Sequence, residues 1–186
     1  MIILQERYNQ EVIPAMMKKF SYKNRHQVPK IEKVIVNIGF GREVVSKDGE
    51  ELKKFIQGVT DSLTLITGQK LSLRKSKQSI SGFKLRKGIN IGAKATLRGK
   101  RMNDFLTRLI NIALPRSRDF RGLDLKGFDQ MGNLSIGLKE HIIFPEVLVE
   151  KAKNIFGFQI IIKTTAKTKE EGIELLRLLR FPIKKD

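Results

Sequence analysis

The sequence predicts an α+β fold, a two-layer sandwich of a mainly antiparallel sheet with helices on one face and a protruding basic loop. Apolar and polar residues alternate with a period of two in several short segments, which is typical of strands with one buried face. Other segments repeat apolar residues at helical spacing. Between Asp61 and Asp104 there is no acidic residue. The basic residues of this interval are Lys70, Arg74, Lys75, Lys77, Lys84, Arg86, Lys87, Lys94, Arg98, Lys100 and Arg101.

The amino-terminal part of the chain is expected to form a helix, a strand and a second helix. Apolar residues recur at helical intervals over residues 3–20, and Pro14 is expected to kink or interrupt this helix. Residues 30–41 alternate between a dry and a wetter side, which predicts a strand. Apolar spacing over residues 52–66 predicts an amphipathic helix that ends near Gly68. The dry side of the strand carries Val34, Val36 and Ile38, and the wetter side carries Lys33, Ile35 and Asn37.

The basic interval itself is expected to form a strand, a loop and a second strand. Residues 70–74 and 91–98 alternate, whereas the segment 75–88 between them is rich in Ser, Lys and Gly. Helical spacing over residues 102–113 then predicts a further helix that Pro115 ends.

The last part of the chain is expected to contain irregular structure, two strands and one helix. Residues 116–132 are rich in turn-forming residues and show no clear period. Residues 134–139 and 158–165 alternate, which predicts two strands. The pattern Thr168-x-x-Glu171 is a capping box and predicts the start of a final helix.

The composition indicates an anionic partner and a packed core. The 186 residues include 37 Lys+Arg and 19 Asp+Glu, a formal net charge of +18. Such a charge favours binding to nucleic acid or to an anionic membrane. A hydrophobic content of 40% is too high for a disordered basic tail, and no Pro/Gly/Ser linker divides the chain. One domain over residues 1–186 is therefore expected.

Other features of the sequence indicate the compartment. There is no cysteine, which excludes disulfides and thiolate metal sites and fits a reducing environment. No apolar run approaches the length of a membrane span, and Glu6 and Glu11 stand where a signal or transit peptide avoids acids. We expect a cytoplasmic protein, although a protein of an organelle has the same features.

The wetter side of the predicted sheet has the chemistry of a nucleic-acid interface. Lys and Arg neutralise phosphates, and Asn, Gln and Thr form hydrogen bonds with sugar hydroxyls or base edges. The face lacks the aromatic residues with which an RNA-recognition motif stacks splayed bases, so contact with phosphates and 2′-hydroxyls of folded RNA fits better. The alternative is that lysines merely keep a solvated sheet face soluble. The residues expected on this side are Lys33, Asn37, Lys70, Ser72, Arg74, Lys94, Thr96, Arg98, Ser135, Lys139, Gln159 and Lys163.

The loop 75–88 places apolar residues among basic ones. Gly82 and Gly88 give it flexibility, so it can project and contact a second polyanion. Alternatively, Ile80, Phe83 and Leu85 tuck under the sheet edge and only the charges face water.

The sequence favours a binding protein over an enzyme. His26 and His141 are the only histidines, and no glycine-rich phosphate loop follows a strand at the required spacing. We therefore expect no catalytic residue, no cofactor and no metal. The competing classes are a DNA-binding protein or general RNA chaperone that uses the same basic face, and, less favoured, a nuclease or RNA-modifying enzyme. A membrane partner is not expected, because the excess charge lies on strands and loops instead of on helices.

Six motifs follow one another along the chain: QVPKIEKVIVNIGFG, LITGQKLSLRKSKQSISGFKLRKG, IGAKATLRGKRMNDFLTRLI, ALPRSRDFRGL, GNLSIGLKEHIIFPE and IIIKTTAKTKEEG. This series resembles the universal ribosomal protein L5 family of the bacterial or organellar type, over the chain from about residue 5 to 183. The family binds 5S ribosomal RNA in the central protuberance of the large subunit, so the resemblance implies a non-enzymatic, ribosome-bound protein. It also implies an antiparallel sheet, helices on one side and a protruding loop.

The resemblance also implies partners and site residues. Asn37, Gln69, Thr96 and Arg98 are implied as hydrogen-bonding residues toward 5S RNA, and Lys33, Arg74 and Lys94 as phosphate partners; Gln69 follows from the resemblance alone. The loop from Ser76 to Lys87 is implied to reach the elbow of transfer RNA in the peptidyl site. The segment 116–129 is implied to contact a small-subunit head protein, and 23S-type RNA and neighbouring large-subunit proteins are further partners. The implied loop contacts are Lys77, Ser81, Phe83, Lys84 and Arg86.

Overall fold

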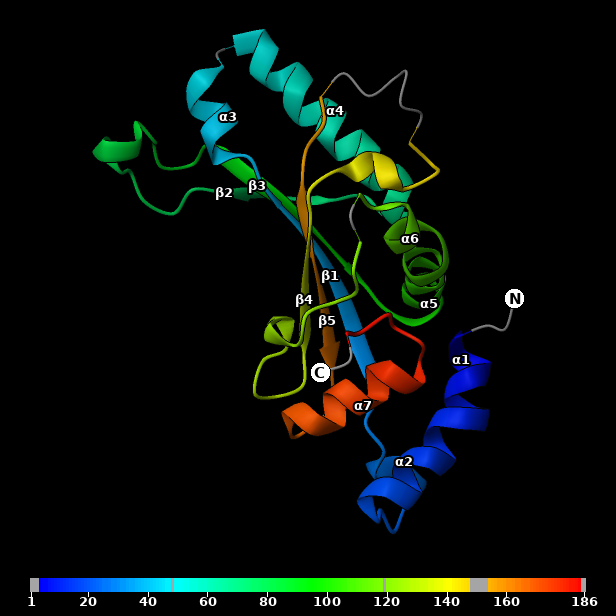
Figure 1. Cartoon of the computed structure of the whole chain (residues 1–186). Helices are drawn as coiled ribbons and strands as arrows, with labels where there is room; N and C mark the ends of the chain where they lie inside the picture. The colour runs from blue at the N-terminus through cyan, green and yellow to red at the C-terminus, as the bar shows by residue number, and fades with distance from the viewer. Residues whose placement is uncertain (1–3, 48, 119, 148–153, 185–186) are drawn as a thin grey trace.

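A computed structural model describes residues 4–47, 49–118, 120–147 and 154–184 (Figure 1). Five strands form one sheet in the order β2–β3–β1–β5–β4, and every neighbouring pair is antiparallel. Helices α4 and α5 contact β3 and β1, respectively. The predicted α+β sandwich is confirmed. The strands are β1 (Ile31–Gly39), β2 (Ser72–Lys75), β3 (Asn90–Leu97), β4 (Leu134–Leu138) and β5 (Phe158–Thr164).

The helices occupy most of the positions that apolar spacing predicts. Figure 1 shows α5 and α6 on one side of the sheet and α7 at its lower end, beside α1 and α2. The short helix α3 was not predicted, because it spans fewer than two turns and has no apolar period. The helices are α1 (Leu4–Arg7), α2 (Ile13–Phe20), α3 (Gly41–Ser46), α4 (Gly49–Thr67), α5 (Gly99–Arg108), α6 (Leu114–Arg116) and α7 (Lys169–Leu178).

The core lies between the sheet and the helices. Every second residue of the central strands is buried, and the helices contribute their apolar stripes to the same cluster. The alternation therefore reports correctly which face of β1, β3, β4 and β5 is dry. In β2 it does not, because all four residues are exposed, including Leu73 at 41%. Core residues of the sheet include Val34, Val36, Ile38, Ala93, Ala95, Leu97, Leu134, Ile136, Ile160 and Ile162.

Two prolines lie in helical segments, each close behind a π-helical turn. Pro14 is in the first turn of α2, directly after a π-helical turn over Tyr8–Val12. The helix predicted over residues 102–113 continues through a second π-helical turn, Leu109–Ala113, into α6, and it ends at Arg116, one residue after Pro115. The missing N–H of each proline removes one helical hydrogen bond, and the wider π-helical turn before it accommodates this loss.

The start of α7 combines a cap with a tertiary contact. The Thr168 hydroxyl accepts a hydrogen bond from the backbone N–H of Glu171 at 3.3 Å, as the capping box predicts. The Glu171 carboxylate also accepts from the Lys167 N–H at 2.8 Å and from the Tyr22 hydroxyl at 2.6 Å. These bonds hold α7 against the end of the amino-terminal helical segment.

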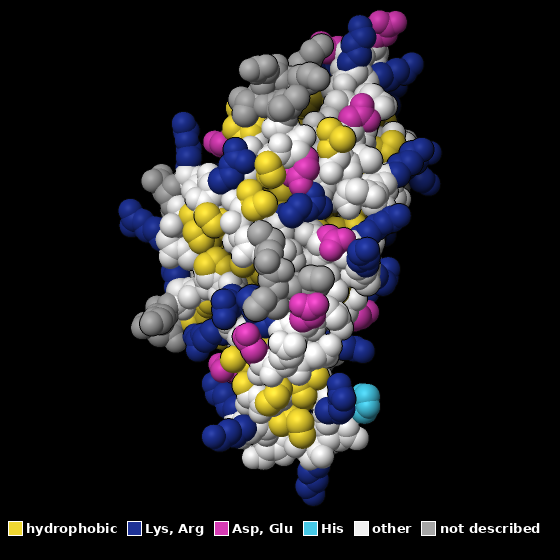
Figure 2. Space-filling view, turned by 90° about the vertical axis from the view of Figure 1, so that its right-hand side faces the viewer, with side chains coloured by type: hydrophobic (Ala, Val, Ile, Leu, Met, Phe, Trp, Pro, Cys, Tyr) yellow, Lys and Arg dark blue, Asp and Glu magenta, His cyan; other side chains and the backbone are white. Residues whose placement is uncertain are grey.

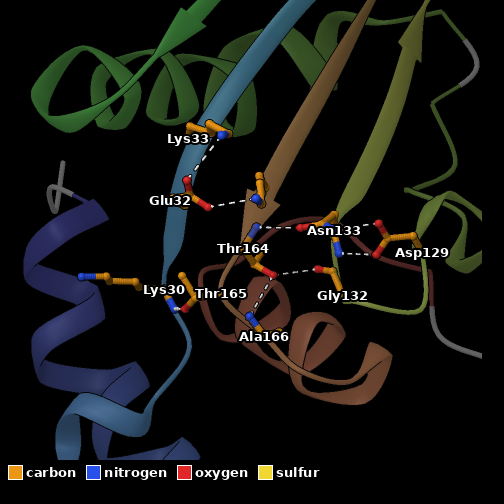
Figure 3. Close-up of polar contacts among 10 residues, drawn as sticks. Lys30, Glu32, Lys33, Asp129, Gly132, Asn133, Thr164, Thr165 and Ala166 are labelled. Atoms are coloured by element: carbon orange, nitrogen blue, oxygen red, sulfur yellow. Dashed lines mark hydrogen bonds and ion pairs between the residues drawn. The ribbon is translucent and has the colours of Figure 1, made fainter.

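A hydrogen-bond network joins the start of β4 to the end of β5 (Figure 3). The Asp129 carboxylate accepts from the backbone N–H of Asn133 at 2.8 Å and from its side-chain amide at 2.7 Å. The Asn133 side-chain carbonyl accepts from the Thr164 N–H at 3.0 Å, and the Thr164 hydroxyl donates to the Gly132 carbonyl at 3.1 Å. The network fixes the β4–β5 edge of the sheet.

Candidate nucleic-acid interface

The strand side chains that point away from the core form an open face with a defined row across all five strands. Residues paired directly opposite each other lie on the same side of a sheet. Lys94 pairs with both Ser72 and Asn37, and Gln159 pairs with both Asn37 and Gly137. The row therefore runs Ser72, Lys94, Asn37, Gln159 and Gly137. It offers one charge, two side-chain amides and a hydroxyl at neighbouring positions.

A second row lies beside the first and has an apolar centre. Ile35 pairs with Ile161, and Thr96 and Ser135 flank this pair on the two sides. Both isoleucines are half-buried. The open face is therefore a polar, hydrogen-bonding surface with a small apolar centre, and no aromatic ring projects from these two rows.

Charge on the strands is almost entirely of one sign. Lys33, Arg74, Lys75, Lys94 and Lys163 are the basic strand residues, and Glu32 is the only acid within the five strands of the described chain. The side of the molecule on which the helices lie differs: Figure 2 shows acidic and basic side chains interspersed there. A polyanion is attracted more strongly to the strands than to this mixed surface.

Lys33 does not point freely to solvent. A β-bulge between Ile31 and Lys33 lets the carboxylate of Glu32 reach both Lys33 and Lys163, each at 3.3 Å. Figure 3 shows Glu32 turned toward Lys33. Hydrogen bonds from Lys163 and Lys33 hold the pKa of the Glu32 carboxyl below its usual value. The carboxylate stays ionised at neutral pH.

The remaining residues of the predicted set lie at the border of the open face. Gln69 follows α4, and its side-chain amide donates to the Thr96 carbonyl at 3.3 Å. Arg98 is exposed at the N-cap of α5. Arg74 pairs with Gly92, where a Cβ would lie 2.6 Å from the Ile38 carbonyl oxygen, so only glycine fits beside this arginine.

Asn37, Lys94 and Thr96 thus lie together near the centre of the face. Lys33 lies at one end of it, in its ion pair with Glu32. The sequence reasoning missed Glu32, because regular alternation places it on the core side with Val34. Burying an unpaired carboxylate in a core costs free energy. A glutamate at a core position of the alternating pattern was therefore a signal that the strand is irregular there.

The segment 76–88 extends away from the body at the ends of β2 and β3 (Figure 1). Ser76 and Gly88 are joined by a backbone hydrogen bond, as are Ile80 and Leu85, so the segment continues the hairpin. The interpretation that its apolar residues tuck under the sheet edge is wrong for two of them, because Ile80 is 42% and Phe83 70% exposed. Leu85 is half-buried. The predicted loop residues Lys77, Ser81, Phe83, Lys84 and Arg86 are all exposed.

The histidines belong to other parts of the structure. His141 is completely buried and stacks on Phe156 with the ring centroids 3.9 Å apart. Burial lowers its pKa, so the ring is held neutral in the core. His26 is exposed in a turn at residues 25–27. No cluster of three or more metal-ligating side chains occurs in the described ranges, and none of the helices described there is long and apolar enough to cross a membrane.

Comparison with known proteins identifies the family. A family model described as "Ribosomal protein L5" matches residues 24–86, and a model of the C-terminus of the same ribosomal family matches residues 90–183. The large ribosomal subunit protein uL5 of Dictyoglomus thermophilum is 53% identical over 185 residues, covering 100% of both chains. The chain belongs to the ribosomal protein L5 family.

Other bacterial relatives are similar over nearly the whole length of this L5-family chain. The uL5 proteins of a Thermoanaerobacter species and of Lacticaseibacillus casei are 50% and 48% identical over 182 residues, covering 98% of each chain. The chain is of the bacterial type, a structural component of the large ribosomal subunit and not an enzyme. The sequence prediction of the family is confirmed.

Proposed function

We propose that this L5-family chain binds 5S rRNA on its open face and thereby helps to form the central protuberance of the large subunit. The observation that carries the proposal is the row of Ser72, Lys94, Asn37, Gln159 and Gly137 across all five strands. Folded RNA presents phosphates and 2′-hydroxyls on a broad, shallow surface, and a sheet face with amides, hydroxyls and lysine complements it.

The roles of the residues follow from their positions. Asn37 and Thr96 donate and accept hydrogen bonds near the centre of the face, while Lys94 and Arg74 neutralise phosphates. Gln69 already donates to the Thr96 carbonyl, so its own side-chain oxygen is the group left to accept from RNA. Arg98 contacts the RNA from the rim. Lys33 contacts it from the end of the face where Glu32 is its ion-pair partner, as a hydrogen-bond donor and not as a free phosphate partner.

The extended segment 76–88 is placed to contact a second RNA. We propose that it contacts the elbow of peptidyl-site tRNA through Lys77, Ser81, Phe83, Lys84 and Arg86. Support comes from their exposure and from the position of the segment beyond the sheet, where it can reach a partner while the open face is occupied.

Further partners complete the proposal. The segment 116–129, apart from residue 119, runs from the last residue of α6 through irregular chain and a short 3-10 turn at Leu125–Gly127. We propose that it contacts a small-subunit head protein. 23S-type rRNA and neighbouring large-subunit proteins are the remaining partners. We place the protein in the cytoplasm on the ribosome, or on an organellar ribosome. We also propose one domain over residues 1–186, because strands from the two matched segments alternate within one sheet.

A competition experiment tests the RNA assignment. Binding of 5S rRNA and of an unrelated RNA of equal length is titrated by filter retention, at near-physiological salt with excess competitor RNA. We expect a preference for 5S rRNA of about a hundredfold or more, a threshold set below the ratio of about 10³–10⁷ that is typical of specific over non-specific protein–DNA binding. Equal affinities would refute the proposal and leave a general RNA-chaperone or DNA-binding role for the same basic face.

A further inference from the structure

Glu32 is chemically out of place on a surface that binds a polyanion. It is the only acid in the five strands of the described chain, and its carboxylate contacts Lys33 and Lys163. Those two lysines are paired directly opposite each other on β1 and β5, on the open face. One carboxylate therefore engages both cations at this end of the face.

The backbone is built so that Glu32 reaches this position. Residue 32 would share the core side with Val34 and Val36 in a regular strand. The irregular register between Ile31 and Lys33 breaks the alternation at this point, and Glu32 is exposed instead of buried. Bulges commonly redirect a side chain in this way.

The ion pairs of Glu32 contribute little to the stability of the fold. Its two ion pairs are exposed, since the side chains of Glu32, Lys33 and Lys163 are 39%, 22% and 46% accessible to solvent. Exposed pairs contribute little to folding. The carboxylate does separate two lysines that would otherwise repel each other across the strands, and this benefit is also small.

We propose that Glu32 is a specificity-determining residue that excludes RNA phosphates from the Lys33–Lys163 end of the open face. A phosphate entering here must displace or approach a carboxylate, whereas a ribose hydroxyl or a base amino group can donate a hydrogen bond to it. An RNA that places its phosphate backbone at this end of the face therefore binds more weakly than an RNA that places a hydrogen-bond donor there. Discrimination by a repulsive group complements discrimination by attractive contacts.

The test uses the full chain and three variants. Glu32→Gln removes the charge and keeps the shape, and Glu32→Asp keeps the charge. Glu50→Gln is the matched control, because it changes the net charge equally on α4. Within the described part of the chain Glu50 pairs only with Lys54, at 3.8 Å, and both side chains are more than four-fifths exposed. Affinities for 5S rRNA and for an unrelated RNA are measured against salt concentration.

Glu32→Gln is expected to tighten binding of the unrelated RNA by about three- to tenfold at 100 mM salt and to steepen its log-log salt slope by about 0.7 for each phosphate admitted. Binding of 5S rRNA should change less than twofold, so the preference for 5S rRNA shrinks. Glu32→Asp and Glu50→Gln should behave like the unsubstituted protein.

The role of Glu32 rests on the proposed function, but different outcomes of this experiment would refute the two. If Glu32→Gln and Glu50→Gln show the same slope on the unrelated RNA, phosphate exclusion by Glu32 is wrong, whether or not the unsubstituted protein prefers 5S rRNA. If the slope steepens and 5S rRNA tightens by the same factor as the unrelated RNA, the specificity role is wrong. If the unsubstituted protein lacks any preference, the proposed function itself is overturned.

Discussion

Substitution of Asn37 by alanine removes the central amide of the row across the sheet. Asn37 lies between Lys94 and Gln159 and is half-buried. No hydrogen bond joins its side chain to another residue in the part of the chain that the structure describes, so its donors and acceptor are available to RNA. The substitution therefore removes contacts with a partner and leaves the folded protein largely unchanged.

The magnitude follows from the hydrogen-bonding capacity of one amide. A net hydrogen bond contributes about 0.5–1.5 kcal/mol, and a side-chain amide facing RNA makes about two of them. Asn37→Ala should therefore weaken 5S rRNA binding by about 1–3 kcal/mol, or roughly 5- to 150-fold in Kd. Because no charge is lost, the slope of log affinity against log salt should stay the same. The unfolding free energy should change by less than about 0.5 kcal/mol.

Filter binding of 5S rRNA and of an unrelated RNA, at several salt concentrations, measures the affinity and its salt slope. Asn111→Ala is the control, because Asn111 is exposed in the π-helical turn after α5 and its side chain donates only within that helical segment, to the Thr107 carbonyl. It should leave both RNAs unaffected. If Asn37→Ala weakened the unrelated RNA as much as 5S rRNA, the readout role of Asn37 would be refuted.

Three further predictions concern a charge, the loop and the core. Lys94→Ala should flatten the salt slope by about 0.7–0.9 and weaken both RNAs alike; an unchanged slope would show that Lys94 contacts no phosphate. Lys84→Ala combined with Arg86→Ala should spare 5S rRNA binding and reduce tRNA retention in the peptidyl site of ribosomes carrying the variant, and equal loss of both would refute the division between face and loop. Burial lowers the pKa of His141 from 6.5. The unfolded state therefore takes up this proton first, so the full stability contribution is present above pH 6.5 and is lost as the pH falls below it. Urea unfolding between about pH 7.5 and 5.5 should show this loss, and His141→Phe should remove it.

The sequence allowed prediction of the faces of the strands but not of their alignment. Alternation around Val34 and Val36 reports which side chains are buried, because the period of a strand is fixed by its backbone geometry. It carries no information on which residue lies opposite which. The row that places Lys94 beside Asn37 and Asn37 beside Gln159 follows from the register, and the register depends on tertiary packing.

Features that break a period could not be predicted for the same reason. The bulge before Lys33 and the π-helical turn before Pro115 each alter the repeat on which the prediction relies. Gln69 stands outside any strand, between α4 and β2, so alternation could not identify it. Its contact with the Thr96 carbonyl is a long-range one that only the folded chain creates.

In the proposed complex, the distribution of charge on the sheet should orient the RNA. The strands β2 and β3 carry Arg74, Lys75 and Lys94 with no acid, whereas β4 carries no charge. At the other end of β1 and β5, Glu32 offsets Lys33 and Lys163. Phosphate contacts should therefore concentrate on the β2–β3 half, next to the basic segment 76–88, and hydrogen-bond contacts on the β1–β5 half. The adjacent residues Lys94 and Asn37 lie at the boundary, and their substitutions should accordingly separate salt-dependent affinity from sequence-dependent preference within one pair of neighbours.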